Sequence, residues 1–256
     1  MRNRFKEADY FIENGDYSVE EIDTEEITIL NWNIQKKNRT DHWTKDFKQL
    51  LEDYVPHIIQ LQECQFQKGL EKLLHAEHYG FIFAPNFVDI LKNLHSGVLS
   101  ASYSRHKQST IIKSYAFEPL IKVPKIFLSS TYSISNRNDE LLLLNIHAIN
   151  FVGFWKFISQ VQQLEYAIKT HSGPIILSGD FNTWNKRRTS ILDKILMNAG
   201  LSKIEFDNDH KKNIKKFFWS DSLDHIYYRG LSPSTTHVLK TKTSDHNPLI
   251  VKFKLI

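Results

Sequence analysis

The hydrophobic residues along the chain follow two different spacings, which predict strands in some segments and helices in others. The segment Ile27–Asn33 (ITILNWN) is rich in β-branched residues and predicts a buried strand. Between Trp43 and Tyr54 the apolar residues recur every three or four positions, which predicts an amphipathic helix that stops before Pro56. The same spacings predict further helices at 65–75, 154–170 and 191–199, and further strands at 57–62, 80–83, 97–103, 109–117, 125–134, 141–147, 175–179, 223–228, 235–240 and 249–255.

The number and order of these elements predict the fold class. Strands outnumber helices too far for a simple doubly wound sheet, and two packed sheets with helices outside fit the pattern better. We therefore expect one α/β domain over residues 27–256. Residues 1–26 are polar and acidic near their end, so we expect an N-terminal extension that lies on the domain or is partly disordered.

Composition and charge narrow the class of protein. A chain of 256 residues with 41% hydrophobic and 24% charged residues is typical of a soluble globular protein with a substantial core. The sequence has no apolar run near the ~20 residues of a membrane span, and no apolar signal segment at its start. The single cysteine, Cys64, excludes an internal disulfide and favours a reducing compartment. We expect a cytoplasmic monomer, with signal-independent export left open. The net charge of +4 permits a polyanionic partner without requiring one.

The candidate chemistry lies at the ends of the predicted strands. Carboxylates, carboxamides and histidines stand there in six places: Asn33, Glu63, His147, Asp180 with Asn182, Asp224, and Asp245 with His246. Any one of them alone is as well explained as a turn residue, a helix cap or a surface histidine. Together they are the side-chain types that metal-assisted hydrolysis of a phosphoester needs, and strand ends of a layered sandwich can meet in one cleft.

Six short motifs carry these residues, and their order along the chain resembles a known family. The motifs are NWNIQ, LQE, NIHAIN, SGDFN, SLDHIYY and SDHNPL, and they span nearly all of residues 27–256. They resemble the endonuclease/exonuclease/phosphatase superfamily, which includes deoxyribonuclease I, apurinic endonucleases and sphingomyelinases. NIHAINF, HSGPIILSGDFNTW and SDHNPL are most similar to its bacterial YafD-like branch. The resemblance implies a four-layer α/β sandwich, in agreement with two packed sheets flanked by helices.

The resemblance also implies a divalent metal centre. A phosphodiester is anionic, so its hydrolysis needs charge neutralisation, an activated water and help for the leaving oxygen. Hard oxygen ligands suit Mg²⁺ or Mn²⁺, and a few carboxylates with several waters suffice. By resemblance, Glu63 is the primary metal ligand with Asn33 beside it, and Asp245 joins them or binds a second ion.

Asp180 and Asn182 follow directly on the strand predicted at 175–179. On an extended backbone, residues two apart point to the same side, so this carboxylate and this amide would face one phosphate while Phe181 enters the core. By resemblance, Asp180 orients or deprotonates the attacking water, and Asn182 positions that water and the phosphate.

The resemblance gives the two histidines separate roles. His246 contacts the phosphate oxygens, with Asp224 fixing its tautomer and supporting its positive charge. His147 corresponds to the second histidine of deoxyribonuclease I, which assists the leaving group. The choice of general acid and general base stays open. Gln35 stands where apurinic endonucleases carry a metal-supporting aspartate, which puts a second metal in question and argues against a simple repair endonuclease.

Several further residues have both a functional and a structural interpretation. Asn150 contacts a phosphate or forms a turn, and Ser244 forms a hydrogen bond in the metal shell or in a turn. Lys186, Arg187 and Arg188 hold a polyanion beside the cleft or begin a solvated helix. A second basic run, residues 211–216, leads into the aromatic residues 217–219, which would stack on bases or belong to a solvated loop.

The favoured function is a divalent-metal-dependent phosphodiesterase, and specifically a nuclease that hydrolyses DNA. The six motifs, the mild basicity and the basic clusters support it. An alternative keeps the chemistry and changes the substrate to phosphoinositide or sphingomyelin headgroups. Residues 87–91, with Leu94, are the one small apolar candidate for membrane docking. A catalytically silent binding module is disfavoured, because none of the core motif positions is degraded.

Overall fold

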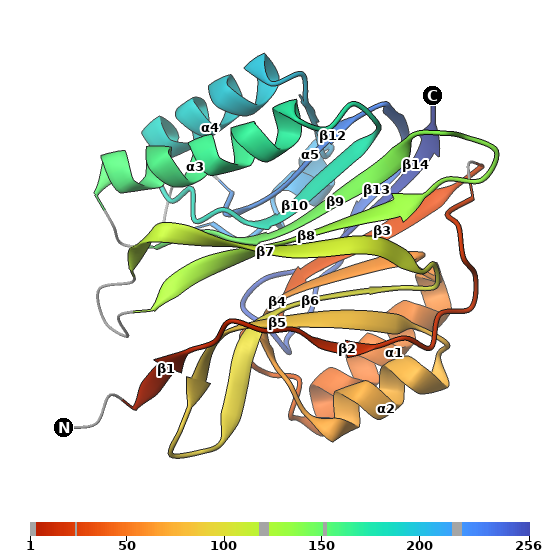
Figure 1. Ribbon diagram of the computed structural model, residues 1–256, viewed down its shortest axis with the longest axis vertical. Coiled ribbons are helices and arrows are strands. Elements are labelled where there is room, and N and C mark those ends of the chain that lie inside the picture. Colours follow the sequence, from red (N-terminus) through yellow and green to blue (C-terminus); the bar gives the residue numbers. More distant parts are fainter. Residues whose placement is uncertain (1–3, 24, 118–122, 151–152, 217–221) are drawn as a thin grey trace.

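Two β-sheets pack face to face between two layers of helices (Figure 1). The computed structural model describes residues 4–23, 25–117, 123–150, 153–216 and 222–256. Helices α3 and α4 cover the outer face of one sheet, and α1 and α2 cover the outer face of the other. The predicted four-layer α/β sandwich of two mixed sheets is therefore confirmed.

The first sheet contains one parallel pair, β3 with β4, among antiparallel neighbours. Its strand order is β1-β5-β6-β4-β3-β14-β13, and β2 also pairs with β5. The strands are β1 (Phe5–Glu7), β2 (Ile12–Asn14), β3 (Ile27–Asn33), β4 (Ile58–Gln65), β5 (Gly80–Asp89), β6 (Leu94–Ser102), β13 (Leu231–Val238) and β14 (Leu249–Leu255).

The second sheet also contains one parallel pair, β9 with β10. Its strand order is β11-β12-β10-β9-β8-β7. The strands are β7 (His106–Phe117), β8 (Pro124–Ser133), β9 (Glu140–His147), β10 (Ile175–Asp180), β11 (Ser202–Lys203) and β12 (Asp224–Arg229).

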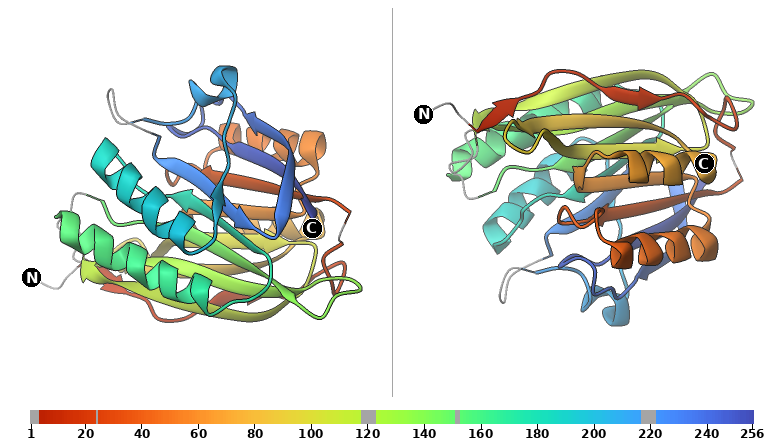
Figure 2. Two further views of the ribbon diagram at one scale, coloured as in Figure 1. Left: turned by 90° about the horizontal axis from the view of Figure 1, so that it is seen from above. Right: turned by 90° about the horizontal axis from the view of Figure 1, so that it is seen from below.

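The helices lie outside the sheets, and α3 and α4 run side by side (Figure 2). The helices are α1 (Asp41–Tyr54), α2 (Lys68–Ala76), α3 (Phe154–Lys169), α4 (Lys186–Asn198) and α5 (Asn208–Lys211). In α1 the spacing of Trp43, Phe47 and Leu51 buries one face, as predicted. Val55, the residue after the helix, caps it: it adopts the left-handed conformation and donates its N–H to Leu51 O over 2.9 Å. None of the helices in the described part of the chain combines the length and apolar character that a membrane crossing needs.

Alternation along the strands fills three apolar layers. Ile29 points between the two sheets, whereas its neighbour Leu30 points under α1 and α2. In the second sheet Leu143 points between the sheets, and Leu144 points under α3 and α4. Because central strands are buried on both faces, they read in the sequence as continuous apolar runs.

The predicted elements are present, but some of their ends differ. β5 continues past Phe83 to Asp89, and α4 begins at Lys186 instead of near Ile191. The earlier start of α4 follows from Asn185, whose side chain accepts a hydrogen bond from Arg188 N. Four short elements, β1, β2, β11 and α5, are additions to the predicted ones.

The described residues of the N-terminal segment lie along the β5 edge of the first sheet and also contact β7 of the second sheet. β1 and β2 both pair antiparallel with β5. Arg4 Nη2 lies 2.6 Å from Asp89 Oδ2, and Tyr17 Oη lies 2.7 Å from His106 Nδ1. The segment therefore extends one edge of the sandwich with two short strands.

Candidate functional site

The two parallel strand pairs end at the same edge of the sandwich and bring four predicted site residues together. Asn33 ends β3, and His147 and Asp180 end β9 and β10 in direct register. Asn33 Nδ2 donates to Asp180 Oδ2 over 2.9 Å, a bond between the two sheets. His147 Nε2 lies 3.7 Å from Glu63 Oε1 and 3.8 Å from Asp180 Oδ2. Glu63 and Asp180 thus belong to one cluster.

A local irregularity in β4 directs Glu63 into this cluster. The pairing of β4 with β6 shifts register between Leu61 and Cys64, as a β-bulge does. Glu63 at the shift has a positive φ of 50°, which is uncommon for a residue with a side chain. Its carboxylate is 25% exposed, whereas Gln62 and Cys64 on either side are fully buried. The bulge therefore turns one carboxylate out of a buried strand.

Asn182 differs from its predicted conformation. β10 ends at Asp180, and Asn182 has a positive φ of 51°, so the prediction of an extended backbone here is wrong. The Asn182 N–H donates to Asp180 Oδ1 over 2.9 Å, and Asn182 Nδ2 donates to Ala148 O over 2.8 Å. The hydrogen bond from Asn182 N to Asp180 Oδ1 therefore holds these two residues together within a turn. Their side chains are not aligned by the alternation of an extended strand that the sequence predicts. Phe181 enters the core, as predicted.

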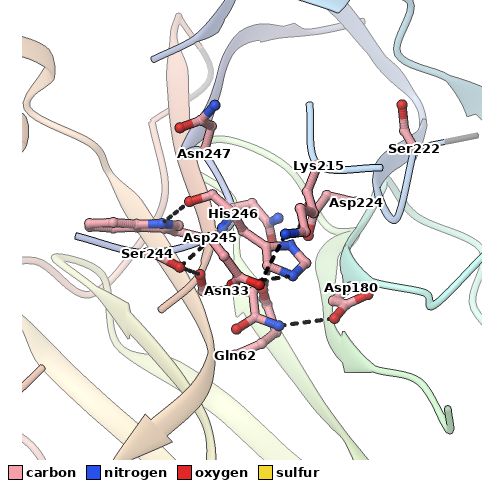
Figure 3. Close-up of polar contacts among 12 residues, drawn as sticks. Asn33, Gln62, Asp180, Lys215, Ser222, Asp224, Ser244, Asp245, His246 and Asn247 are labelled. Carbon is pink, nitrogen blue, oxygen red and sulfur yellow. Dashed lines mark hydrogen bonds and ion pairs between the residues drawn. The ribbon is translucent and has the colours of Figure 1, made fainter. Parts of the chain in front are cut away.

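His246 and Asp224 form a buried pair next to this cluster (Figure 3). His246 Nδ1 lies 2.7 Å from Asp224 Oδ2, and Asp224 is paired in register with Asp180. The loop that carries His246 is anchored to β3 by two hydrogen bonds. Trp32 Nε1 donates to His246 O over 2.9 Å, and Ser244 Oγ donates to Asn33 O over 2.7 Å.

The two histidines have opposite pKa shifts. Burial opposes a charge on His246, but Asp224, with smaller effects from two other aspartates, raises its pKa to about 9. Burial, with the nearby charge of Lys125, lowers the pKa of His147 well below its ordinary value. At neutral pH the site therefore holds one imidazolium and one neutral imidazole.

The two acidic groups of the cluster also differ. Burial raises the pKa of Asp180 to about 6, with Asp224 acting in the same direction and His246 against it. Burial opposes ionisation of Glu63 as well, but His147 and two lysines outweigh it and lower the Glu63 pKa to about 2. Glu63 is thus a fixed carboxylate, while Asp180 is able to exchange a proton near neutral pH.

Two lysines at the site, Lys125 and Lys36, lie outside the six motifs. Lys125 is buried, and its Nζ lies 3.0 Å from Nε2 and 3.2 Å from Nδ1 of His147. Lys36 Nζ lies 3.3 Å from Glu63 Oε2. The sequence does contain a signal for Lys125, since it stands inside a strand between Pro124 and Ile126. A lysine flanked by buried apolar residues is rare without a partner or a function.

A layer of four buried carboxamides and one serine joins the two sheets beneath the site. Gln62 Nε2 donates to Asn31 Oδ1 over 2.9 Å and to Asn145 Oδ1 over 2.8 Å. Ser178 Oγ is shared between Asn31 Oδ1, at 3.0 Å, and Gln60 Oε1. All five side chains are fully buried. We call them the amide layer.

The amide layer follows the site residues along the strands. Its members precede site residues by two positions on three strands: Asn31 before Asn33, Asn145 before His147, and Ser178 before Asp180. Residues two apart on a strand share a face, so the layer forms the floor of the site. Its bonds between sheets fix the spacing of the strand ends above it.

The side chains predicted as metal ligands offer the oxygen atoms that Mg²⁺ prefers. Glu63 offers an ionised carboxylate that is partly exposed, beside the carboxamide of Asn33. Asp245 is 40% exposed, and its Oδ2 lies 3.1 Å from Lys215 Nζ. Across the described residues, no group of three or more His, Cys, Asp or Glu side chains forms a ready metal site. Mg²⁺ often binds through one or two carboxylates and keeps several waters, so this sparse oxygen set suits it.

The basic residues at the start of α4 divide into two groups. Lys186 and Arg187 are exposed, and the Arg187 guanidinium lies 3.8 Å from the Phe154 ring centroid. Arg188 is 1% exposed, so neither predicted role, polyanion contact or solvated helix start, describes it. It stacks on Trp184 and donates to Asn182 O over 3.3 Å, which supports the turn at the site.

The structure gives the remaining predicted residues no demonstrated role. Asn150 is half-buried in the segment that follows β9. The aromatic residues 217–219 lie outside the described residues, so their predicted stacking has no structural counterpart here. Of the basic run 211–216, Lys215 pairs with Asp245.

The sequence and the fold both match known proteins. Residues 30–246 match the Endonuclease/Exonuclease/phosphatase family. The chain is 35% identical to a UPF0294 protein of Vibrio parahaemolyticus over 237 residues, which cover 91% of this chain and 79% of the relative. It is also 35% identical to a UPF0294 protein of Vibrio campbellii over 233 residues, with 90% and 78% covered. These relatives confirm the predicted YafD-like branch.

Solved structures show the same fold at low sequence identity. The human nocturnin catalytic domain with bound sulfate has a TM-score of 0.67 at 17% identity, with 96% of this chain and 97% of that chain covered. D. rerio TDP2 complexed with single strand DNA product has a TM-score of 0.62 at 16% identity, with 90% and 100% covered. Family match, relatives and fold agree, so the chain belongs to the endonuclease/exonuclease/phosphatase family of phosphoric ester hydrolases, whose members commonly use divalent metals.

Proposed function

We propose that the protein is a divalent-metal-dependent phosphodiesterase that hydrolyses nucleic acid, with DNA as the favoured substrate. One observation carries the proposal: a fixed carboxylate, a carboxylate with a raised pKa, a positively charged histidine and a neutral histidine lie at one edge of the sandwich. Hydrolysis of a phosphodiester needs these groups together.

Glu63 and Asn33 would hold the metal ion, and Asp245 would join them or hold a second ion. When bound, the cation neutralises charge on the phosphate and polarises its oxygens. The Asn33 amide already bridges to Asp180 across the sheets, so metal binding and water activation share one hydrogen-bonded frame.

Asp180 would accept the proton of the attacking water. Its carboxylate is oriented by Asn33 Nδ2 on one oxygen and by Asn182 N on the other. A base is most effective when its pKa lies near the operating pH, and the Asp180 pKa of about 6 meets this condition. Asn182, held by Ala148 O, would position the water and the phosphate.

The two histidines would act on the phosphate and on the leaving oxygen. His246, positively charged through Asp224, would donate from Nε2 to a phosphate oxygen. His147, neutral beside Lys125, would stand at the leaving oxygen, where the lysine adds positive charge. All of these groups come from one chain, which supports action as a monomer.

The surface near the site is compatible with a nucleic acid substrate. Lys186 and Arg187 are exposed at the start of α4, and Trp155 at the start of α3 is 77% exposed. Asn150 would contact a phosphate on the same side. The fold accommodates a DNA strand, since D. rerio TDP2 has been solved with a single strand DNA product.

Lipid headgroups are the second candidate substrate, because one apolar tip is exposed. In the turn between β5 and β6, Ile90 is 43% and Leu91 76% exposed. If the tip docks on membranes, replacing both residues with serine abolishes binding to anionic liposomes. Liposome binding that is unaffected, or absent in the parent protein, would exclude this role.

A plasmid-nicking assay with Mg²⁺ tests the proposed function. We expect His246→Ala to reduce the rate ~10²–10³-fold, the cost of losing one positioned donor to the phosphate, and chelator to abolish it. His75→Ala is a matched control, because His75 Nδ1 also lies 2.7 Å from an aspartate, Asp16, but at the surface. Cleavage by the His246 variant at the parental rate would contradict the mechanism.

A further inference from the structure

A basic groove lies beside the candidate site and has no part in the roles proposed above. It has a volume of about 1020 Å³. Four lysines line it: Lys37, Lys212, Lys240 and Lys242. Asp46 is the one carboxylate among its described lining residues. We call it the lysine groove.

The lysine groove shares a wall with the site. Asn247 lines the groove and directly follows His246 in the chain (Figure 3). Asn247 Oδ1 accepts from Thr241 N over 2.9 Å, and Asn247 Nδ2 donates to Asn213 O over 2.7 Å. These two bonds hold the groove segments around 213 and 241 against the residue next to the site histidine.

Two further connections lead from the groove to the site. Lys37 follows Lys36, whose Nζ lies 3.3 Å from Glu63 Oε2. Three residues beyond Lys212, the Nζ of Lys215 lies 3.1 Å from Asp245 Oδ2. The chain segments that form the groove therefore also supply or contact site residues.

The groove presents positive charge that the protein itself leaves largely uncompensated. Lys37, Lys240 and Lys242 are exposed and form no ion pair with any described residue. Lys212 Nζ lies 2.7 Å from Asp209 Oδ1, but the Asp209 side chain is 90% exposed, and such a pair is worth little.

The Asp46 carboxylate in the groove forms hydrogen bonds that stabilise the loop before His246. Asp46 Oδ2 accepts hydrogen bonds from Thr241 Oγ1 over 3.0 Å and from Thr243 Oγ1 over 2.9 Å. These bonds tie the loop before His246 to α1. The backbone that carries Lys240 and Lys242 is thus held in place, which reduces the entropic cost of binding a ligand there.

We propose that the lysine groove binds the backbone of a polynucleotide strand, through phosphates other than the one being hydrolysed. The position of the scissile phosphate is taken from the proposed function. Several cations along one groove match a ligand that repeats its negative charges, whereas a single headgroup phosphate needs only one of them. Every large hydrophobic side chain with marked exposure in the described chain lies outside the groove lining, so a lipid tail has no contact there.

Binding in the absence of metal tests the groove separately from hydrolysis. Fluorescence anisotropy with labelled single-stranded DNA and RNA, in EDTA, gives the affinity at several salt concentrations. The test variant is Lys37→Glu/Lys240→Glu/Lys242→Glu. The control is Lys72→Glu/Lys92→Glu/Lys194→Glu, which makes the same charge change at exposed lysines outside the groove.

We expect the groove variant to bind at least tenfold more weakly than the control. Its slope of log affinity against log salt should be shallower by about 2, from three lost phosphate contacts at ~0.7 each on a single strand. The DNA and RNA arms show whether the sugar matters. Equal weakening in both variants, or no binding by the parent protein, would overturn the proposal.

Hydrolysis distinguishes failure of the groove from failure of the proposed function. Turnover of a small diester that bears one phosphate requires the site alone. A protein that hydrolyses this diester but does not bind oligonucleotides would overturn the groove and leave the hydrolase standing. A protein that binds oligonucleotides through the groove but cleaves no diester with Mg²⁺ or Mn²⁺ would overturn the proposed function and support the groove.

Discussion

At the scale of single residues, the site shows how neighbours decide what a side chain does. His246 and His147 are both buried, yet only His246 has a carboxylate at hydrogen-bonding distance, Asp224 at 2.7 Å. His147 instead faces Lys125. The same residue type therefore supplies a charged donor in one place and a neutral ring in the other.

Lys125 allows a prediction at this scale. Lys125→Met should lower turnover on plasmid DNA about 10²-fold, the effect of losing one positioned electrostatic group. The fold should persist, because methionine fills a similar volume without burying a charge. Turnover and thermal melting of the same preparations check this. Lys107→Met, on the neighbouring strand β7 and exposed, is the control and should change neither. A Lys125 variant with full activity would restrict this lysine to a structural role.

Residue types were more predictable than residue environments. The motifs placed Glu63, Asp180 and His246 in one candidate set, and the structure brings them together at one edge. The motifs did not reveal that Arg188 is buried or that Lys125 reaches His147. Both facts depend on which strands and rings pack around a side chain, and a local pattern does not contain this information.

At the scale of elements, hydrogen bonds between buried polar side chains align the strand ends of the two sheets. The amide layer connects β3 and β4 of one sheet with β9 and β10 of the other. Apolar contacts between sheets have no direction, so they do not fix how the strand ends are aligned. Hydrogen bonds are directional and do fix it.

Removing one member of the amide layer should affect stability and activity together. In Asn145→Leu, Gln62 Nε2 would lose one of its acceptors, and the Leu99 carbonyl would lose the donor Asn145 Nδ2, which lies 2.8 Å away. Each buried group left without a partner costs about 1–3 kcal/mol. We expect lower stability in urea unfolding and, below the unfolding transition, lower turnover.

Ser130→Ala supplies the control for this prediction. Ser130 is buried in β8 and bonds Ser109 Oγ at 3.0 Å, away from the strand ends of the site. Its loss should cost about 1 kcal/mol and leave turnover unchanged. Equal turnover in the two variants would show that the amide layer contributes only stability.

Element types followed from the sequence, whereas their irregularities did not. β3 and β14 have the predicted bounds because β-branched and other apolar residues fill most positions from one end of each strand to the other. The bulge at Glu63 and the left-handed turn at Asn182 arise from pairing with β6 and from bonds to Asp180 and Ala148. These partners are distant in sequence or act through backbone geometry, so hydrophobic spacing carries no sign of them.

At the scale of the whole molecule, the sandwich places ionisable groups in apolar surroundings between its layers. His225 on β12 is buried beside Phe181, and its Nε2 lies 2.7 Å from Thr183 Oγ1. Burial, together with the charge of Lys203, lowers the pKa of His225 well below its ordinary value of 6.5. The folded protein therefore keeps this histidine neutral where the unfolded chain would protonate it.

This difference predicts acid sensitivity with a definite sign. A histidine with a lowered pKa in the folded state gives its full stability above the unfolded pKa, and loses it as the pH falls below 6.5. One such group contributes up to about 1.4 kcal/mol per pH unit. In His225→Gln, which can still bond Thr183, the free energy of unfolding should fall less steeply from about pH 6.5 to about pH 5. Urea unfolding across this range measures the slope of the free energy of unfolding against pH, and above pH 6.5 the two proteins should have the same slope.

If the slope below pH 6.5 is the same in both proteins, His225 is already protonated in the folded protein there, which contradicts the prediction. Another buried group, such as His57 with its own lowered pKa, would then account for the acid sensitivity.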